Sequence, residues 1–446
     1  MPDWLFEFVN PWTTPAALLF LIVGIAWCIG IRGRTLAIVA MVAALCLGLW
    51  QAWKAGPPSG LLDLQIYTNS ARAWVEGGSL YDYSDPVFRL SATYPPIGPQ
   101  LFAIFTPFTA DGREVLFTAV SLVALFGCAW SVAGLADVPR DQRFTWSAWG
   151  FAAAMVTIPV WLTLRQGQVN ILLWFLVLFD LEALRNSRRW AGFGIGVATA
   201  IKLVPGLFLA WLVLAGRWAA ALRAIIGLAA LTGLGWLLAP SDSRRYWTEL
   251  LWDSERVGSV TDSRNNSALS VIGRAFDVGS GRTLLWVIVC IALLTVAAIR
   301  SVRASRSGDL LAVAAIVGCA SAAVSPISWT HHLGFLLVAL AAFFVSAPDR
   351  RTRILCLIAW LVLVEPGGHG ESAVMSTVRA LLLVGAVCCT PIRSQGSTID
   401  SDGDPERERS DQTETTLNTR PTKSALPSSS LFRRMAIPPI TFAPRS

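Results

Sequence analysis

The sequence has little charge and few of the residues that bind metal ions. Only 15% of its 446 residues are Asp, Glu, Lys or Arg and three are His, whereas 54% are hydrophobic and 20 are Trp. A soluble chain cannot keep so much apolar surface out of water, since an ordinary domain has about 25% charged residues. Many apolar runs reach the roughly 17–25 residues that a helix needs to cross a bilayer. The composition predicts a polytopic membrane protein and excludes a soluble enzyme or a nucleic-acid-binding protein.

Several common signatures are absent as well. The eight cysteines lie inside apolar runs without metal-ligand spacing, which argues against a disulfide framework or a zinc site. The chain has no Gly-x-x-x-x-Gly-Lys loop for nucleotide phosphates and no internal repeat with a period of about 20–50 residues. Its N-terminus lacks the features of a cleaved signal peptide, so the first apolar segment is expected to remain as a helix.

Clusters of Lys and Arg between the apolar runs predict the orientation in the membrane. The positive-inside rule makes the following segments cytoplasmic: residues 32–34, 140–143, 185–189, 217–223, 300–306, 350–353 and everything after Arg393. The alternation then places the 54–96 and 240–282 loops on the outer side. We expect about 11–13 spans from run lengths. Residues 97–110 are either a short kinked span or a re-entrant piece, because they are few and contain Pro99 and Pro107.

The chain changes character near residue 396. Residues 397–446 contain 21 Ser, Thr or Pro, seven acidic and seven basic side chains, and no Trp. Such a segment cannot bury enough apolar surface to offset the entropy of ordering it. We therefore expect a membrane domain over residues 1–395 and a disordered cytoplasmic tail, dispensable for chemistry, over 396–446.

A short helix predicted in the 54–96 loop carries an outer carboxylate. Its apolar and polar residues fall on opposite sides, as in a helix on the outer membrane surface: Leu62, Ile66, Ala73 and Trp74 against Asp63, Tyr67 and Ser70. Asp63 is expected in the first turn, where the helix dipole favours an ionised carboxylate. There it either caps the helix or acts as a general base toward a hydroxyl.

Other polar residues interrupt apolar runs on the predicted outer side. His331 and His332 would point about 100° apart on a helix and rarely share a metal; they contact a phosphate or sugar, or lie at the interface. Lys202 in an apolar run needs a partner such as a lipid phosphate. Arg244 and Arg245 either hold a phosphate or form a solvated loop face. Amides suit sugar hydroxyls as well as ordinary turns, and the candidates are Gln166, Gln168, Asn170 and Asn265.

An ordered set of motifs runs from about residue 55 to about residue 335. It comprises Asp63 with Tyr67 and Ala71, Gly77-Gly78-Ser79-Leu80-Tyr81, Tyr94-Pro95-Pro96, Gln166-Gly167-Gln168-Val169-Asn170, Lys202-Leu203-Val204-Pro205, Asn265-Asn266-Ser267, and Ser325-Pro326 with Trp329, His331 and His332. The set resembles the actinobacterial polyprenol-phosphate-sugar-dependent glycosyltransferases of the GT-C superfamily. That family includes the polyprenol-phosphate-mannose-dependent α-(1→2)-mannosyltransferases.

The resemblance implies a fold, a reaction and a catalytic residue. The fold is an all-α polytopic GT-C membrane protein. The reaction transfers a mannosyl residue from polyprenol phosphate mannose to a phosphatidylinositol mannoside, lipomannan or lipoarabinomannan on the outer face of the plasma membrane, with inversion and an α-(1→2) linkage. In such enzymes an acidic residue of the first external loop is taken as the catalytic base, and Asp63 matches that position.

The remaining polar residues then receive expected roles. Cationic groups facing the donor phosphate stabilise its leaving charge, so we expect no metal or other cofactor. The candidates for this phosphate site are Lys202, Arg244, Arg245, His331 and His332. The candidates for contacts with the sugar or the acceptor are Tyr67, Gln166, Gln168, Asn170 and Asn265.

Two alternatives remain open from the sequence. The family also contains an arabinofuranosyltransferase that uses decaprenyl-phosphate arabinose, and the residues do not identify the donor sugar. A flippase for sugar lipids would also show many spans and outer polar groups, although the chain lacks the repeat-related pair of broken helices typical of transporters. Under either glycosyltransferase reading, the expected partners are a lipid-linked donor, a glycolipid or lipoglycan acceptor and membrane lipids, and no nucleic acid.

Overall fold

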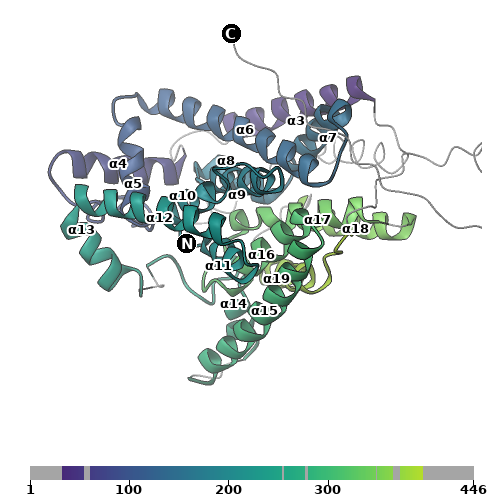
Figure 1. Ribbon diagram of the computed structural model, residues 1–446. Coiled ribbons are helices and arrows are strands. Elements are labelled where there is room, and N and C mark those ends of the chain that lie inside the picture. Colours follow the sequence, from purple (N-terminus) through teal and green to yellow (C-terminus); the bar gives the residue numbers. More distant parts are fainter. Residues whose placement is uncertain are drawn as a thin grey trace, which may run out of the picture. The chain divides into compact units, whose positions relative to one another are not determined.

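The described part of the chain is helical. The computed structural model describes residues 33–54, 61–253, 256–276, 280–347, 349–364 and 372–394, and no strand occurs within these ranges (Figure 1). The predicted all-α fold is confirmed, whereas the predicted tail and the first apolar segment lie outside the described residues. The helices are α3 (Arg34–Lys54), α4 (Leu62–Val75), α5 (Ile97–Leu101), η1 (Phe102–Phe105), α6 (Ala110–Leu135), α7 (Arg140–Met155), α8 (Ile158–Gln166), α9 (Asn170–Arg185), α10 (Phe193–Ile201), α11 (Gly206–Leu214), α12 (Trp218–Leu238), α13 (Pro240–Arg245), η2 (Tyr246–Leu250), α14 (Ala268–Ala275), α15 (Ser280–Arg306), α16 (Leu310–Val324), η3 (Thr330–His332), α17 (Gly334–Val345), α18 (Arg350–Val364) and α19 (Ala373–Cys389).

Long apolar helices identify a membrane protein. Among the described residues, α6, α12 and α15 are long and apolar enough to cross a bilayer, and α7 with α8, bent by 75°, forms a fourth candidate. Only 17% of the apolar stretch of α15 is buried, so its side chains are available to lipid. Apart from α3, which has 21 residues, the remaining apolar helices are shorter than 18 residues, and the expected number of spans stays a prediction.

The core is built around α16. Its residues from Leu310 to Ala323 are all buried, and it packs against α9, α11, α15, α17 and α19. A helix that is apolar on every side is stable only when neighbours surround it. Asp309 caps its first turn by accepting from the N–H of Ala312 at 3.1 Å.

The basic clusters of several helices meet one another. Arg143 of α7 pairs with Glu182 of α9, and Arg185 pairs with Asp137 at the end of α6. Arg393, after α19, donates to Asp309 at 2.9 Å. Segments that the positive-inside rule assigns to one side are thus in contact; which side faces the cytoplasm stays a prediction.

The elements of the 61–105 segment differ in part from their predicted form. The surface helix is confirmed as α4, with Asp63 in its first turn. However, its face with Tyr67 and Ser70 is buried against α5, η1 and α8, so the predicted outward polar face was wrong. Helix α5 has five residues, about 7.5 Å at 1.5 Å per residue, and η1 has four, so neither is long enough to cross a bilayer by itself, and the re-entrant alternative stays a prediction.

Candidate functional site

The carboxylate of Asp63 is held by an amide from a distant loop. Gln168 Nε2 donates to Asp63 Oδ2 at 2.6 Å, and the Asp63 side chain is half-buried. The loop reaches α4 because residue 167, which ends α8, is glycine. Gly167 has φ +68°, and a Cβ there would lie 2.6 Å from the Cβ of Leu64. A larger residue at this position would push the Gln168 loop off α4.

Tyr94 fixes the orientation of the Gln168 amide. Its hydroxyl donates to Gln168 Oε1, which leaves the NH₂ group of the amide directed at Asp63. The ring of Tyr94 stacks on Tyr67 with centroids 4.2 Å apart. The Tyr67 hydroxyl pairs with Thr93 Oγ1 at 2.9 Å. Tyr67 is therefore near Asp63, as predicted, but its hydroxyl is engaged within the protein.

Lys202 brings a positive charge to the same site. It lies where α10 ends, four residues before α11 begins, and its Nζ donates to Asn170 Oδ1 at 3.0 Å. Nζ is also 3.2 Å from His332 Nε2 and 5.0 Å from the centre of the Tyr94 ring. Asn170, the first residue of α9, donates in turn to the carbonyl of His331 at 2.9 Å. Residues from α4, α9, the end of α10, η3, and the segments before α5 and after α8 thus meet in one cluster.

Burial shifts the titration of these groups, which lie outside the helices long enough to cross the membrane. It raises the pKa of Asp63 to about 6, although the Gln168 hydrogen bond and the Lys202 charge oppose the change. It lowers the pKa of Lys202 to about 8, opposed by Asp63. Burial and then the Lys202 charge hold the pKa of His331 and His332 well below the ordinary value. At pH 7 the site therefore holds a carboxylate, an ammonium and two neutral imidazoles.

A neutral His332 suits this arrangement, because its Nε2 can accept from the Lys202 ammonium. The His331 ring meets the His332 ring edge to face, with centroids 4.6 Å apart. His331 is buried, and among the described residues its Nε2 has no hydrogen-bond partner. A buried imidazole nitrogen without a partner is uncommon, and a contact formed only when substrate is bound is one explanation.

Two other predicted site residues, Arg245 and Asn265, are engaged elsewhere. Arg245 donates to Asp82 at 2.6 Å, and Arg244 is exposed to solvent. Both atoms of the Asn265 amide hold loops together: Nδ2 donates to the carbonyls of Val260 and Pro326, and Oδ1 accepts from the backbone of residues 267 and 328. Gln166 is half-buried at the end of α8, and its Oε1 has no partner among the described residues.

Two supporting residues had no role in the sequence-based prediction. Arg256 donates to the carbonyl of Ala92 at 2.8 Å and so holds the irregular segment before Tyr94. Asp242 is buried and accepts from the hydroxyl of Ser79 at 2.7 Å and from the N–H of Leu80 at 2.9 Å. The hydrogen bonds of both residues join positions more than 160 residues apart, so no local sequence pattern could predict them. The Tyr94-Pro95-Pro96 motif was the available signal for Tyr94.

The site offers no obvious set of metal ligands. Across the described ranges, no group of three or more His, Cys, Asp and Glu side chains is placed to hold a metal ion. The cluster instead presents one carboxylate and one ammonium, joined through amides, a tyrosine and an imidazole. Such a pair can remove a proton at one end and stabilise negative charge at the other.

Comparison with known proteins gives consistent matches. The model of Glycosyltransferase family 87 matches residues 92–326, which include Tyr94, Gln168, Asn170 and Lys202. A "Polyprenol-phosphate-mannose-dependent alpha-(1-2)-phosphatidylinositol mannoside mannosyltransferase" of Mycobacterium tuberculosis is 29% identical over 338 residues, 72% of this chain and 78% of the relative. No solved structure matches.

Two pentamannoside enzymes are equally similar. The "Polyprenol-phosphate-mannose-dependent alpha-(1-2)-phosphatidylinositol pentamannoside mannosyltransferase" of Mycobacterium tuberculosis is 32% identical, covering 73% of this chain and 77% of the relative. Its counterpart in Mycolicibacterium smegmatis is 31% identical, covering 74% and 80%. The family match spans more than half of the sequence and the relatives span most of it. The chain belongs to Glycosyltransferase family 87.

Proposed function

We propose that this glycosyltransferase moves a mannosyl residue from polyprenol phosphate mannose to a hydroxyl of a phosphatidylinositol mannoside, forming an α-(1→2) linkage on the outer face of the membrane. The relatives' donor and acceptor support the substrates. The observation that carries the chemistry is the placement of Asp63 and Lys202 in one site, connected through Gln168 and Tyr94.

Asp63 is the base in this proposal. With Oδ2 held by Gln168, Oδ1 takes the proton of the acceptor hydroxyl as that oxygen attacks the anomeric carbon. The bond from the anomeric carbon to the phosphate oxygen breaks, and its electron pair leaves with the phosphate. Attack and departure on opposite faces of the carbon invert its configuration.

Lys202 and the two histidines receive the leaving phosphate. The Lys202 ammonium supplies a charge whose interaction grows as the phosphate gains its negative charge. His332 and Asn170 hold the ammonium in place, and His331 Nε2 is available to a phosphate oxygen. We expect transfer without an added metal, and full activity in EDTA is the measurement that checks this. A loss restored by one divalent cation would contradict it.

The decisive test uses purified protein in detergent with radiolabelled donors. Asp63→Asn should abolish mannosyl transfer, because the amide keeps the shape but lacks the basic oxygen. Asp111→Asn is the matched control, since Asp111 is an exposed acid in the first turn of α6. Near-normal turnover by Asp63→Asn would overturn the role of Asp63.

Two further outcomes would replace the proposed reaction. Asp63-dependent transfer of arabinose from decaprenyl-phosphate arabinose, with none of mannose, would change the donor and keep the mechanism. Lipid movement in vesicles without any covalent product in detergent would make the protein a flippase.

A further inference from the structure

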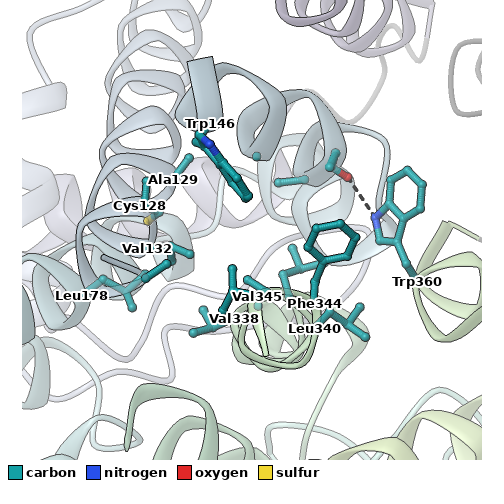
Figure 2. Close-up of a pocket in the computed structure, with 18 of the residues that line it drawn as sticks. Cys128, Ala129, Val132, Trp146, Leu178, Val338, Leu340, Phe344, Val345 and Trp360 are labelled. Carbon is teal, nitrogen blue, oxygen red and sulfur yellow. Dashed lines mark hydrogen bonds between the residues drawn. The ribbon is translucent and has the colours of Figure 1, made fainter. Parts of the chain in front are cut away.

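An apolar cavity of about 210 Å³ lies among α6, α7, α8, α9, α17 and α18. Figure 2 shows its wall, with Trp146, Phe344 and Trp360 around Val338 and Leu340. The Trp360 indole N–H donates to the carbonyl of Ala153 at 3.1 Å, so the one polar atom of that ring is paired within the protein (Figure 2). Apart from Arg353, the lining side chains are uncharged and almost wholly apolar. An occupant must therefore be apolar.

The cavity begins at the elements that carry the candidate site. Trp174 lines it and lies one helical turn after Asn170, and Gly334 lines it two residues after His332. A Cβ on Gly334 would lie 2.4 Å from the Trp174 ring, so glycine lets α17 start directly against α9. Arg353, near the start of α18, is also in the lining. The lining thus includes residues close in sequence to Asn170 and His332 at the start of α17, and Arg353 beside Phe344 near its end.

The position of the cavity selects one lipid over the other. Asn170 and His332, which hold Lys202, belong to the elements at its site end, whereas α4, which carries Asp63, contributes nothing to its wall. In the proposed function the donor's phosphate lies at Lys202 and the acceptor's hydroxyl lies at Asp63. A chain attached to that phosphate is the one that would enter here.

We propose that this cavity holds the phosphate-proximal part of the donor's isoprenoid chain. The proposal rests on the proposed function and adds the place where the enzyme recognises the lipid. Burial of successive isoprenoid carbons there would raise affinity for a long-chain donor and would fix the phosphate against Lys202.

Cavity-filling substitutions, combined with donors of two chain lengths, test the proposal. Ala129→Phe on α6 fills the space beside Trp146, and Ala341→Phe fills it from α17 if α6 does not tolerate the change. Ala119→Phe is the matched control, because Ala119 is an exposed residue of α6 outside the lining. The long-chain donor is polyprenol phosphate mannose, and the short-chain donor is its analogue with a methyl group in place of the isoprenoid chain.

The expected result is selective. Loss of a few buried carbon contacts should lower kcat/KM for the long-chain donor about tenfold, mainly through KM. The kcat/KM for the short-chain donor and the KM for the acceptor should each change less than about twofold, which is within the range of a surface substitution. Equal losses for both donors, no loss for either, or a rise confined to the acceptor's KM would each overturn the proposal.

A binding measurement separates this inference from the proposed reaction. A diazirine-bearing long-chain isoprenyl phosphate should label cavity residues in the unmodified protein and in Asp63→Asn, but not in Ala129→Phe. Labelling without any transfer by the unmodified protein would sink the reaction and keep the cavity assignment. Transfer by a protein that is labelled outside the cavity would overturn the cavity assignment and keep the reaction.

Discussion

Asp63 and Lys202 carry opposite charges only within a limited pH window. Asp63 is a base only when ionised, so activity should fall as the pH drops below its pKa of about 6. Lys202 stabilises phosphate only when protonated, so activity should fall as the pH rises above about 8. We expect a bell-shaped profile of kcat/KM between these limits. Lys202→Arg should remove the alkaline limb, because guanidinium stays protonated; an unchanged limb would assign it to another group.

The hydroxyl of Tyr94 acts through Gln168. Tyr94→Phe keeps the ring that stacks on Tyr67 and faces Lys202 but frees the Gln168 amide to rotate. Loss of this buried hydrogen bond should lower kcat about tenfold and the free energy of unfolding by about 1–3 kcal/mol, because Gln168 Oε1 stays buried without its donor. The control is Tyr83→Phe, whose hydroxyl accepts from Asn69 at 3.0 Å. Equal effects of the two substitutions, measured as initial rates, would contradict a positioning role.

Residue types predicted the chemistry of the site better than they predicted which residues belong to it. Asp63, Gln168, Asn170, Lys202 and the histidines were predicted and do meet, because each interrupts an apolar run and an isolated polar group in such a run needs a partner. Arg244, on α13, and Asn265, before α14, had the same polar character, but solvent and backbone groups satisfy them equally well. Pairing over such sequence distances is set by tertiary structure.

At the scale of elements, the contact between the Gln168 loop and α4 depends on Gly167. Gly167→Ala should cost more than about 1 kcal/mol, because the new Cβ meets both positive-φ strain and the Cβ of Leu64. Gly216→Ala separates the two effects, since Gly216 has φ +69° and nothing within 4 Å of an added Cβ. The Gly167 variant should show the lower unfolding midpoint and a reduced kcat. Equal midpoints and rates would mean that the close approach is unimportant.

The existence of a helix was easier to predict from the sequence than which of its sides is buried. Helix α4 and the helical character of the apolar runs follow from length and periodicity. The face of α4 was misjudged because Tyr67 and Ser70 read as polar, whereas stacking on Tyr94 and Phe102 buries this side. Likewise α10 and α11 have nine residues each, about 13.5 Å, so they are too short to cross a bilayer core of about 30 Å. The interruption of the apolar run at Lys202 does not show how long the helices on either side of it are.

For the whole molecule, the two ends of the helices differ in chemistry. The basic pairs of Arg143, Arg185 and Arg393 connect helix ends that the charge pattern assigns to the cytoplasm. The candidate site lies among segments that the same pattern assigns to the outer side. A lipid-linked donor in the outer leaflet requires that orientation, and the positive-inside rule predicts it independently.

Labelling of single cysteines in intact cells tests this orientation. Glu76→Cys, at the exposed end of α4, should react with a membrane-impermeant maleimide added outside. Arg188→Cys, in the exposed turn after α9, should react only after the membrane is opened, because the rule keeps Lys and Arg of short loops inside. The unmodified protein gives the background from native cysteines. External reaction at residue 188, with protection at residue 76, would place the site on the cytoplasmic side, where an outer-leaflet donor could not reach it.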